Sequence, residues 1–432
     1  VDADNVAIDD ITIQGQADTD GLVIDTTIVS LSLTRVDIVG NASQGRAGIL
    51  VTDTGDVTDL DLVDVTLGSN AIGMRVADAG VVDGMTADAD THFDNNILGL
   101  LVEADPTLAG GAFKDATFTG TTFDGANQQR GVYLEKLDNA VFDGIDVVSN
   151  GDLSAFEVRA SFGSYSGLQL SGTVTSTAAS AEPAVNLRAR PDTGAADGSL
   201  TNVTLEDLTV AGGAYSLRLF DDVTTNLVLG PNVALLNANQ ANVLLDVTPA
   251  SPAIDLGAIA LTNSIGDFIH VGAETDVDAT GVSFDNGSAL SLSSLDDLFT
   301  IEDGILHAID AETFAGMPVG LVTVVAGELF VTTDSFFTPA GTTQADIQRA
   351  INQAAAGDTV NVDDGTYVGA VTIDKDLTLL GQGPATVIES PGSVGGAFTY
   401  SGSAKEAVVA ITDGVVTIED LTVDGAGLGN SV

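Results

Sequence analysis

The sequence contains no cysteine, and its three histidines, His92, His270 and His307, are widely scattered. Disulfides are therefore excluded. A fold built from continuous strand stacking does not need them, so the absence of cysteine is compatible with secretion. No spacing of histidines is typical of a zinc site, and no serine, histidine and aspartate can be grouped as a catalytic triad. We expect His307 to be a partly buried structural residue rather than a base.

Basic residues are scarce as well. Lysine and arginine together number 13, against 62 acidic residues, and the formal net charge is −49. Nucleic acids and anionic membranes both require basic patches, so neither is expected as a partner. Two explanations of the charge remain open: a strongly hydrated surface suited to salty surroundings, or specific cation sites. The 44% of hydrophobic residues excludes a disordered acidic tail.

Signals for a membrane or for export are also missing. No apolar stretch is long enough to span a bilayer, and no charged start is followed by an apolar signal region. The chain opens on Val1 rather than on methionine, which indicates a processed product or a piece of a longer chain. We expect no membrane insertion, and we infer a secreted or cell-surface location from the class of protein alone.

What the sequence does contain is a short phrase that recurs roughly every 25 residues between Val1 and about Asn286. Each copy begins with glycine or alanine, followed by two apolar residues one position apart, a small polar break and a second alternating run. The first half of the phrase begins at Gly21, Gly48, Gly73, Gly99, Gly131, Ala155, Ala184, Ala214 and Ala241. Alternation at period two predicts strands with one buried face. A fixed period in the twenties predicts the stacked coils of a solenoid.

The chain divides into three zones. Residues 1–290 carry about ten coils. Residues 291–341 interrupt them, with apolar residues at helical spacing followed by short apolar runs. The helically spaced residues are Leu295, Leu298, Phe299, Ile305 and Ile309. Residues 342–432 are expected to form a cap helix and the first coils of a second solenoid segment.

The cap helix is predicted at about residues 344–355. Thr343 fits an N-cap, with Asp346 three residues further on, and Gly357 stands where a C-cap is expected. The apolar face of this helix consists of Ala345, Ile347, Ile351 and Ala354.

A family resemblance becomes specific at this point. The run IQRAINQAAAGDTVNVDDGTY from Ile347 to Tyr367, followed by VTIDKDLTLLG from Val371 to Gly381, resembles the opening of a right-handed parallel β-helix of the pectin-lyase-like superfamily. The chain as a whole is most similar to the repeat units of large bacterial secreted or surface β-helix proteins. The resemblance is close over about 90 residues and implies an all-β solenoid with two short helices. It does not imply one activity, because the superfamily includes lyases, hydrolases, epimerases, tailspikes, adhesins and structural repeats.

The signature strings of the superfamily's enzymes are mostly absent. The Gly-His-Gly and Arg-x-Lys strings of polygalacturonases do not occur, and neither does the Tyr-Gly-x-Asp-Pro-His string of alginate epimerases. Of the Arg-x-Pro-x-x-Arg string of pectate lyases, only a fragment at Arg188-Ala-Arg190-Pro191 is present. We therefore assign no catalytic residue, and the sequence favours a role other than catalysis.

The order of elements is unusual for a single β-helix, because the cap helix follows about ten coils instead of preceding them. The pattern of residues 416–425 also matches that of residues 6–15. An uncapped solenoid end exposes backbone hydrogen-bonding groups that another chain can extend. We expect either a repeat unit of a longer polypeptide or copies that associate head to tail. The predicted assembly interface consists of Val6, Ile8, Ile11 and Ile13 at one end and Ile418, Leu421 and Val423 at the other.

Three arginines form the main candidate for a ligand-binding site. Alignment of the coils places Arg159, Arg188 and Arg218 in one outward column, spaced by about 4.8 Å. Such a ladder is suited to a uronate polysaccharide, with Glu135 or Asp221 nearby as acid or base. The alternative is that the arginines relieve carboxylate crowding in neighbouring ladders.

Calcium is the cofactor that the composition suggests. Asp53, Asp56 and Asp59 crowd one turn-to-strand region, and a hard cation requires six to eight oxygen ligands. However, neither EF-hand spacing nor a Gly-Gly-x-Gly-x-Asp repeat is present. In a chain with 50 aspartates, a solvated acidic face is the favoured interpretation.

These observations favour a structural β-solenoid protein, a building block of an extracellular fibre, surface coat or adhesin that stacks end to end with other copies of itself. The alternative is a polysaccharide-active enzyme (a lyase, hydrolase or epimerase) or a glycan-binding tailspike that uses the arginine-bearing face.

Overall fold

The computed structural model describes residues 5–427 apart from several short gaps. The gaps are residues 16–17, 44, 106–110, 126–128, 161, 178–180, 190–197, 222, 224, 248–252, 315–316, 336–345, 393–397, 401–402 and 406. The described chain is all-β with two short helices, and none of its helices is both long and apolar enough to cross a membrane. It divides into two compact units: unit 1 comprises Val1–Thr248 and Ala258–Gly266, and unit 2 comprises Pro249–Gly257 and Asp267–Val432.

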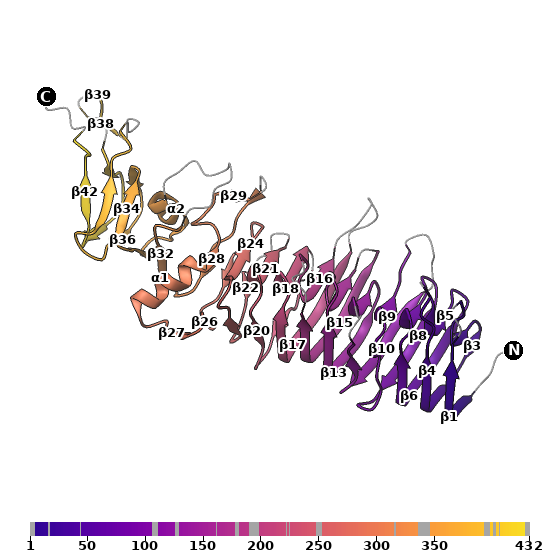
Figure 1. Cartoon of the computed structure of the whole chain (residues 1–432). Helices are drawn as coiled ribbons and strands as arrows, with labels where there is room; N and C mark the ends of the chain where they lie inside the picture. Colours follow the sequence, from indigo (N-terminus) through magenta and orange to yellow (C-terminus); the bar gives the residue numbers. More distant parts are fainter. Residues whose placement is uncertain are drawn as a thin grey trace. The chain divides into compact units, whose positions relative to one another are not determined.

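Unit 1 is a stack of coils that contribute parallel strands to two sheets (Figure 1). The first sheet contains, in spatial order, β1 (Val6–Gln14), β4 (Leu31–Val39), β6 (Asp56–Gly68), β8 (Val81–Ala87), β10 (Ala112–Thr119), β13 (Asp138–Ser149), β15 (Ser164–Ser176), β17 (Ser199–Gly212), β20 (Ala234–Leu236) and β23 (Ala260–Thr262). Beside them, β3 (Thr27–Ile28), β11 (Thr122–Phe123) and β19 (Val228–Leu229) pair with β6, β13 and β17.

The second sheet follows the same order of coils. Its strands are β2 (Leu22–Ile24), β5 (Ala47–Val51), β7 (Ile72–Val76), β9 (Leu98–Val102), β12 (Arg130–Leu134), β14 (Phe156–Arg159), β16 (Val185–Ala189), β18 (Tyr215–Asp221) and β21 (Ala241–Asp246). Because each strand pairs in parallel with the equivalent strand of the next coil, unit 1 is a parallel β-helix, which confirms the predicted fold class.

The alternation of apolar residues explains the buried face of these strands. Along β6, Val57, Leu60, Leu62, Val65 and Leu67 are all fully buried. The alternation breaks where the strand bends, and the bend recurs at the same position in consecutive coils. Six such positions hold Asp59, Gly84, Asp115, Asn139, Gly167 and Asn202, with φ between 52° and 80°. Aspartate, asparagine and glycine tolerate this left-handed conformation best. Some of the aspartates are therefore explained by the backbone conformation at the bends instead of by their charge.

Side chains of one kind also stack from coil to coil inside unit 1. Asn41 donates from its backbone N and from Nδ2 to Oδ1 of Asn70, at 3.1 and 2.9 Å. The backbone N of Asn70 in turn donates to Oδ1 of Asn96 at 2.9 Å. All three side chains are buried, and apart from Oδ1 of Asn41 this ladder provides partners for polar groups that the interior would otherwise penalise.

Aromatic rings stack in the middle coils. The ring centroids of Phe93 and Phe123 are 4.7 Å apart, as are those of Phe118 and Phe142. These large apolar surfaces are fully buried, and they stabilise the coils that precede the arginine-bearing strands.

Unit 2 contains α1 (Leu295–Asp303), α2 (Asp346–Gln353) and a second solenoid segment. Its three parallel sheets are β32 (Glu328–Val331), β33 (Thr359–Val362), β36 (Leu377–Leu380) and β41 (Val416–Glu419); β34 (Gly365–Val368), β37 (Thr386–Glu389) and β42 (Thr422–Asp424); and β35 (Val371–Ile373) with β40 (Val409–Ile411). From β33 onward, strands of these sheets that follow one another along the chain belong to different sheets, as expected for a coil.

Shorter pairings complete unit 2. Those that are parallel are β22 (Ile254–Asp255), β25 (Val277–Asp278) and β31 (Val322–Thr323), and β24 (Asp267–Val271) with β28 (Ile305–Leu306). Those that are antiparallel are β26 (Ser283–Asp285) with β27 (Ala289–Leu290), β29 (Thr313–Phe314) with β30 (Met317–Pro318), and β38 (Phe398–Tyr400) with β39 (Ser403–Lys405).

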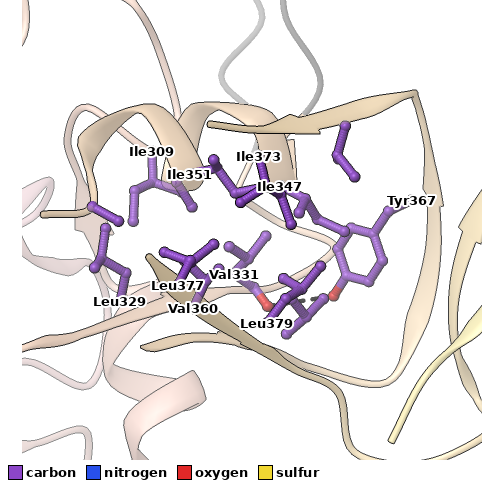
Figure 2. Close-up of a cluster of buried hydrophobic side chains, with 14 of the residues drawn as sticks. Ile309, Leu329, Val331, Ile347, Ile351, Val360, Tyr367, Ile373, Leu377 and Leu379 are labelled. Carbon is purple, nitrogen blue, oxygen red and sulfur yellow. Dashed lines mark hydrogen bonds between the residues drawn. The ribbon is translucent and has the colours of Figure 1, made fainter. Parts of the chain in front are cut away.

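Helix α2 covers the core of this second segment, which confirms the predicted cap. Figure 2 shows Ile347 and Ile351 of α2 in one buried cluster with Val331, Val360 and Leu379. The end of the helix is fixed by Lys375, whose Nζ donates to the carbonyl oxygens of Ile351 and Ala354 at 3.0 and 2.9 Å. A cation is favourable at a helix C-terminus. Thr343 and Ala345 of the predicted cap lie outside the described residues.

The helical spacing predicted up to Ile309 was wrong beyond Asp303. Helix α1 ends there, with Gly304 as its C-cap, while Ile305 belongs to β28 and Ile309 lies in a turn. Ile305 is drawn into a strand because it pairs in parallel with Ile269 of β24. Tertiary pairing therefore overrides the local helical pattern after Gly304.

Candidate functional site: the outward face of the second sheet

The predicted arginines lie on the outward face of the second sheet of unit 1. Arg159 on β14 and Arg188 on β16 are register partners on neighbouring coils, as predicted. The placement of Arg218 in the same column was wrong: Arg218 lies opposite Asn186, and the partner of Arg188 on β18 is Phe220. The outward face therefore has two columns of polar residues instead of one ladder.

The shift of two residues has its cause in the core. Leu217 and Leu219, which are at most 1% exposed, lie opposite Val185 and Leu187 in the interior. Alignment by the alanines would have placed Tyr215 at the first of these positions. The hydroxyl of Tyr215 instead reaches the surface and donates to Oε1 of Gln240 at 2.6 Å. A tyrosine hydroxyl requires such a partner, whereas the leucines bury no polar atom.

A buried carboxylate lies among the arginines. Glu157 of β14 is 3% exposed; its Oε2 lies 3.0 Å from Nη2 of Arg130, and its Oε1 lies 3.9 Å from Nη1 of Arg188. Burial raises the pKa of Glu157, while the positive charges of Arg130, Arg188 and Arg159 oppose the shift. The carboxylate is thus held by cations in a poorly hydrated place.

Aromatic rings support the guanidinium groups. The Cζ atom of Arg130 lies 4.3 Å from the ring centroid of Tyr133, and the ring of Phe220 lies 4.3 Å from Cζ of Arg218 and 5.4 Å from Cζ of Arg188. Stacking orients a planar guanidinium while leaving its edge available for hydrogen bonds, and it is attractive in its own right. Aromatic rings as well as carboxylates therefore hold the guanidinium groups of these arginines in place.

Glu135 lies close by, but both of its oxygens are engaged. Oε1 accepts a hydrogen bond from the Tyr133 hydroxyl at 2.7 Å, and Oε2 accepts one from the backbone N of Ala104 at 2.9 Å. Burial and the charge of Glu135 raise the pKa of Tyr133, and a hydrogen bond with Arg159 opposes the shift. The predicted acid or base role of Glu135 stays a prediction.

The side-chain amide of Asn186 has a hydrogen-bond donor and an acceptor that no other group of the described chain pairs with. Asn186 is fully buried, and neither its Oδ1 nor its Nδ2 has a hydrogen-bond partner. The Nε atoms of Arg130, Arg188 and Arg218 are likewise buried without an acceptor. A buried polar group that makes no hydrogen bond costs roughly 1–3 kcal/mol. Four such side chains lie on this one face.

The other predicted ligand residue, Asp221, is the last residue of β18, with a φ of 58° opposite Ala189. On the same strand, Nη2 of Arg218 donates to Oδ2 of Asp246 on β21 at 3.0 Å. A contribution of Asp221 to ligand binding stays a prediction.

The predicted assembly residues lie in three strands and a turn. Val6, Ile8, Ile11 and Ile13 belong to β1, which pairs with β4. Ile418 belongs to β41, Leu421 follows it, and Val423 belongs to β42. Asp420, with a φ of 52°, turns the chain between the two strands and places them in different sheets. Head-to-tail association stays a prediction.

The weak calcium candidates are spread over one coil. Oδ1 of Asp53 accepts a hydrogen bond from the backbone N of Ala79 at 3.0 Å, Asp56 begins β6, and Asp59 occupies the bend described above. Among the described residues, no group of three or more histidine, cysteine, aspartate or glutamate side chains is placed to hold a metal ion.

A hollow in unit 1 lies on the first sheet. It has a volume of about 210 Å³, and polar residues of β13, β15 and β17 line it. Its polar lining consists of Asp143, Gln169, Ser171 and Glu206. Ser171 donates from Oγ to Oδ1 of Asp143 at 3.0 Å, so this lining is partly satisfied within the protein.

A second buried polar cluster lies in unit 2 around His307, which is 1% exposed. Its Nδ1 accepts from the backbone N of Val322 at 3.0 Å, so Nε2 donates to Oε1 of Glu302 at 2.9 Å. Asp310 accepts from the backbone N of His307 at 2.9 Å. Burial opposes protonation, but the charges of Glu302 and Asp310 raise the pKa of His307. Burial raises the pKa of Asp310 to about 7.

Several residues of the arginine face were not predicted from the sequence. They are Arg130, Tyr133, Glu157, Asn186 and Phe220. A signal for three of them was present, because Tyr133, Glu157 and Asn186 occupy the same outward position in consecutive copies of the repeat. No sequence signal marks Arg130 or Phe220, which reach the cluster through cross-coil packing.

Comparison with known proteins adds little to this geometry. No protein-family model and no curated protein matches the sequence. Among solved structures, the chain is similar to two structures of the PL6 family alginate lyase AlyGC, one of which is a mutant. The sequence identity to each is 12%. They cover 98% of this chain and 77% and 69% of the respective lyase chains, with TM-scores of 0.22 and 0.21. Likeness at this level carries no information about activity.

Proposed function

We propose that this chain is a carbohydrate-recognising β-helix that binds an acidic polysaccharide along the outward face of β12, β14, β16, β18 and β21, hereafter the arginine face. The observation that carries the proposal is the fully buried Asn186, whose amide makes no hydrogen bond although it lies between Glu157 and Arg218 in register. A saccharide offers hydroxyl and carboxylate groups that match an amide and guanidinium groups.

The charge distribution supports this proposal. The chain has a net charge of −49 and contains only nine arginines. Four of these lie on four consecutive coils of unit 1: Arg130, Arg159, Arg188 and Arg218. Guanidinium groups form bidentate hydrogen bonds with carboxylates, so a uronate is a better match than a neutral sugar. Coils repeat at about 4.8 Å, which suits an extended chain of repeating units. A secreted or cell-surface location would bring the protein to such polymers.

The direct test is retention on immobilised polygalacturonate and alginate, with a neutral glucan as the control polymer. Wild-type protein should bind the two acidic polymers and not the glucan. Arg188→Met and Arg218→Met should each weaken binding by about tenfold, equivalent to one lost charge-assisted contact. Arg35→Met is the matched control, because Arg35 pairs with Asp10 on the first sheet. Equal loss in the Arg35 variant, or no binding by the wild type, would refute the proposal.

The same samples distinguish binding from turnover. Polymer incubated with the wild type is assayed for new reducing ends and for unsaturated products. Products that disappear in Arg188→Met would assign an enzyme of the lyase or hydrolase class to the arginine face. Binding without products would assign a recognition module.

A further inference from the structure

The arginine face contains one place where a carboxylate is already bound. Glu157 lies between β12 and β16, with Oε2 at 3.0 Å from Arg130 and Oε1 at 3.9 Å from Arg188. Its neighbour in register on β16 is Asn186, whose amide makes no hydrogen bond. The two arginines and the asparagine thus surround a carboxylate that the protein itself supplies.

Resting on the proposed function, we propose that Arg130, Arg188 and Asn186 form the seat for one uronate carboxylate of the glycan, and that Glu157 occupies this seat while no glycan is bound. The side chains of Arg130 and Arg188 are 20% and 22% exposed, whereas that of Glu157 is 4% exposed. An incoming carboxylate therefore meets the guanidinium groups before it meets Glu157.

The seat has more donors than Glu157 uses. Nε of Arg130 and Nε of Arg188 are buried without an acceptor, and Nδ2 of Asn186 has none either. A glycan carboxylate can accept from these donors, and a hydroxyl next to it can donate to Oδ1 of Asn186. A neutral sugar lacks the charge, and a sulfate group alone does not supply the hydroxyl donor.

Exchange of the two carboxylates depends on the charge of Glu157. The titratable and charged groups that act on it are Arg130 and Tyr133 on β12, Arg159 on β14, Arg188 on β16 and Glu182 before β16. Protonation removes the attraction between Glu157 and the arginines, and burial of the carboxylate favours protonation. A uronate carboxylate has an ordinary pKa near that of free carboxyls, about 3–4, so it stays ionised at pH 5. Falling pH therefore frees the seat for the glycan.

The test measures the affinity of the full chain for oligogalacturonate from pH 7.5 to pH 5. For the wild type, affinity should rise as the pH falls. Glu157→Gln should bind about tenfold more tightly at pH 7.5, since one competing ion pair is removed, and its affinity should change little with pH. Glu103→Gln is the matched control: it removes the same charge from the same sheet, where Glu103 pairs with Arg75 at 2.7 Å.

The outcomes separate this proposal from the proposed function. Wild-type binding that requires Arg188 but neither rises at low pH nor improves in Glu157→Gln beyond Glu103→Gln would overturn the seat alone. Absence of binding by every protein at every pH would overturn both. If Glu157→Gln does not fold, as judged by circular dichroism, Glu157→Asp decides, because its shorter side chain draws the carboxylate away from Arg130 and Arg188: tighter binding than in Glu103→Asp supports the seat, and equal affinity overturns it.

Discussion

Arg130 and Glu157 form an ion pair between neighbouring coils, with Nη2 3.0 Å from Oε2, and their side chains are only 20% and 4% exposed. On the same sheet, Arg75 and Glu103 form a closer pair at 2.7 Å, with side chains 32% and 25% exposed. The two pairs share their chemistry and their sheet, but differ in access to water.

This difference predicts different contributions to stability. Arg130→Met leaves the Glu157 carboxylate buried with fewer partners, so the free energy of unfolding should fall by about 3 kcal/mol. Arg75→Met breaks a more hydrated pair and should cost less than about 1 kcal/mol. Urea unfolding followed by circular dichroism measures both. Equal losses in the two variants would show that burial of Glu157 does not decide the effect.

The left-handed bends of the first sheet give a second prediction. Asn139 has a φ of 56°, and its Nδ2 donates to Oδ1 of Asp115 at 3.0 Å. Asn139→Ala should lower the free energy of unfolding by about 1–2 kcal/mol, because a Cβ without a local hydrogen bond disfavours this conformation. Asn139→Gly should cost clearly less, since glycine tolerates positive φ. If alanine and glycine proved equivalent in urea unfolding, the bend would not be the source of the preference.

The coils were predictable because their cause is local and repeated. Alternation along β6 and the recurrence of glycine or alanine at the strand starts specify a buried face and a period, which are enough for a β-helix. The amphipathic pattern of Ile347 and Ile351 likewise predicted the cap helix α2.

The arrangement of the arginine face could not be predicted in the same way. Which outward residues meet depends on the register between coils, and loops of different length separate successive coils. The register at β18 was set by burial of Leu217 and Leu219, which the aligned alanines did not reveal. Arg130 meets Glu157 across the separate register between β12 and β14, so a carboxylate among arginines is recognised only once the coils are stacked.

The net charge predicts a strong response to salt. Repulsion among surface carboxylates is screened over ~10 Å at 0.1 M salt and over ~3 Å at 1 M. The melting temperature should therefore rise steadily with sodium chloride. Calcium compared with sodium at equal ionic strength tests for specific sites, which would add to the rise. A melting temperature that stays constant up to molar salt would contradict charge crowding as a destabilising factor.

The buried cluster around His307 predicts that unit 2 loses stability as the pH rises. Asp310 has a pKa of about 7 in the folded chain, against about 3.9 in an unfolded one. Between these values the folded state holds a proton that the unfolded state has lost, so stability falls as the pH increases. The pKa of His307 is also raised, and its contribution is lost as the pH rises through the folded value. Both groups therefore act in the same direction.

Asp310→Asn isolates this effect from the general acidity of the chain. Asparagine keeps an oxygen that can accept from the backbone N of His307 but does not titrate, so the loss of stability between pH 5.5 and pH 8 should become smaller. Asp413→Asn removes an equal charge from an exposed position of unit 2 and should leave the wild-type dependence intact. Hydrogen exchange of peptides from α2, measured in high salt to screen surface carboxylates, follows unit 2 by itself. Identical pH dependence in the two variants would show that the buried cluster does not control it.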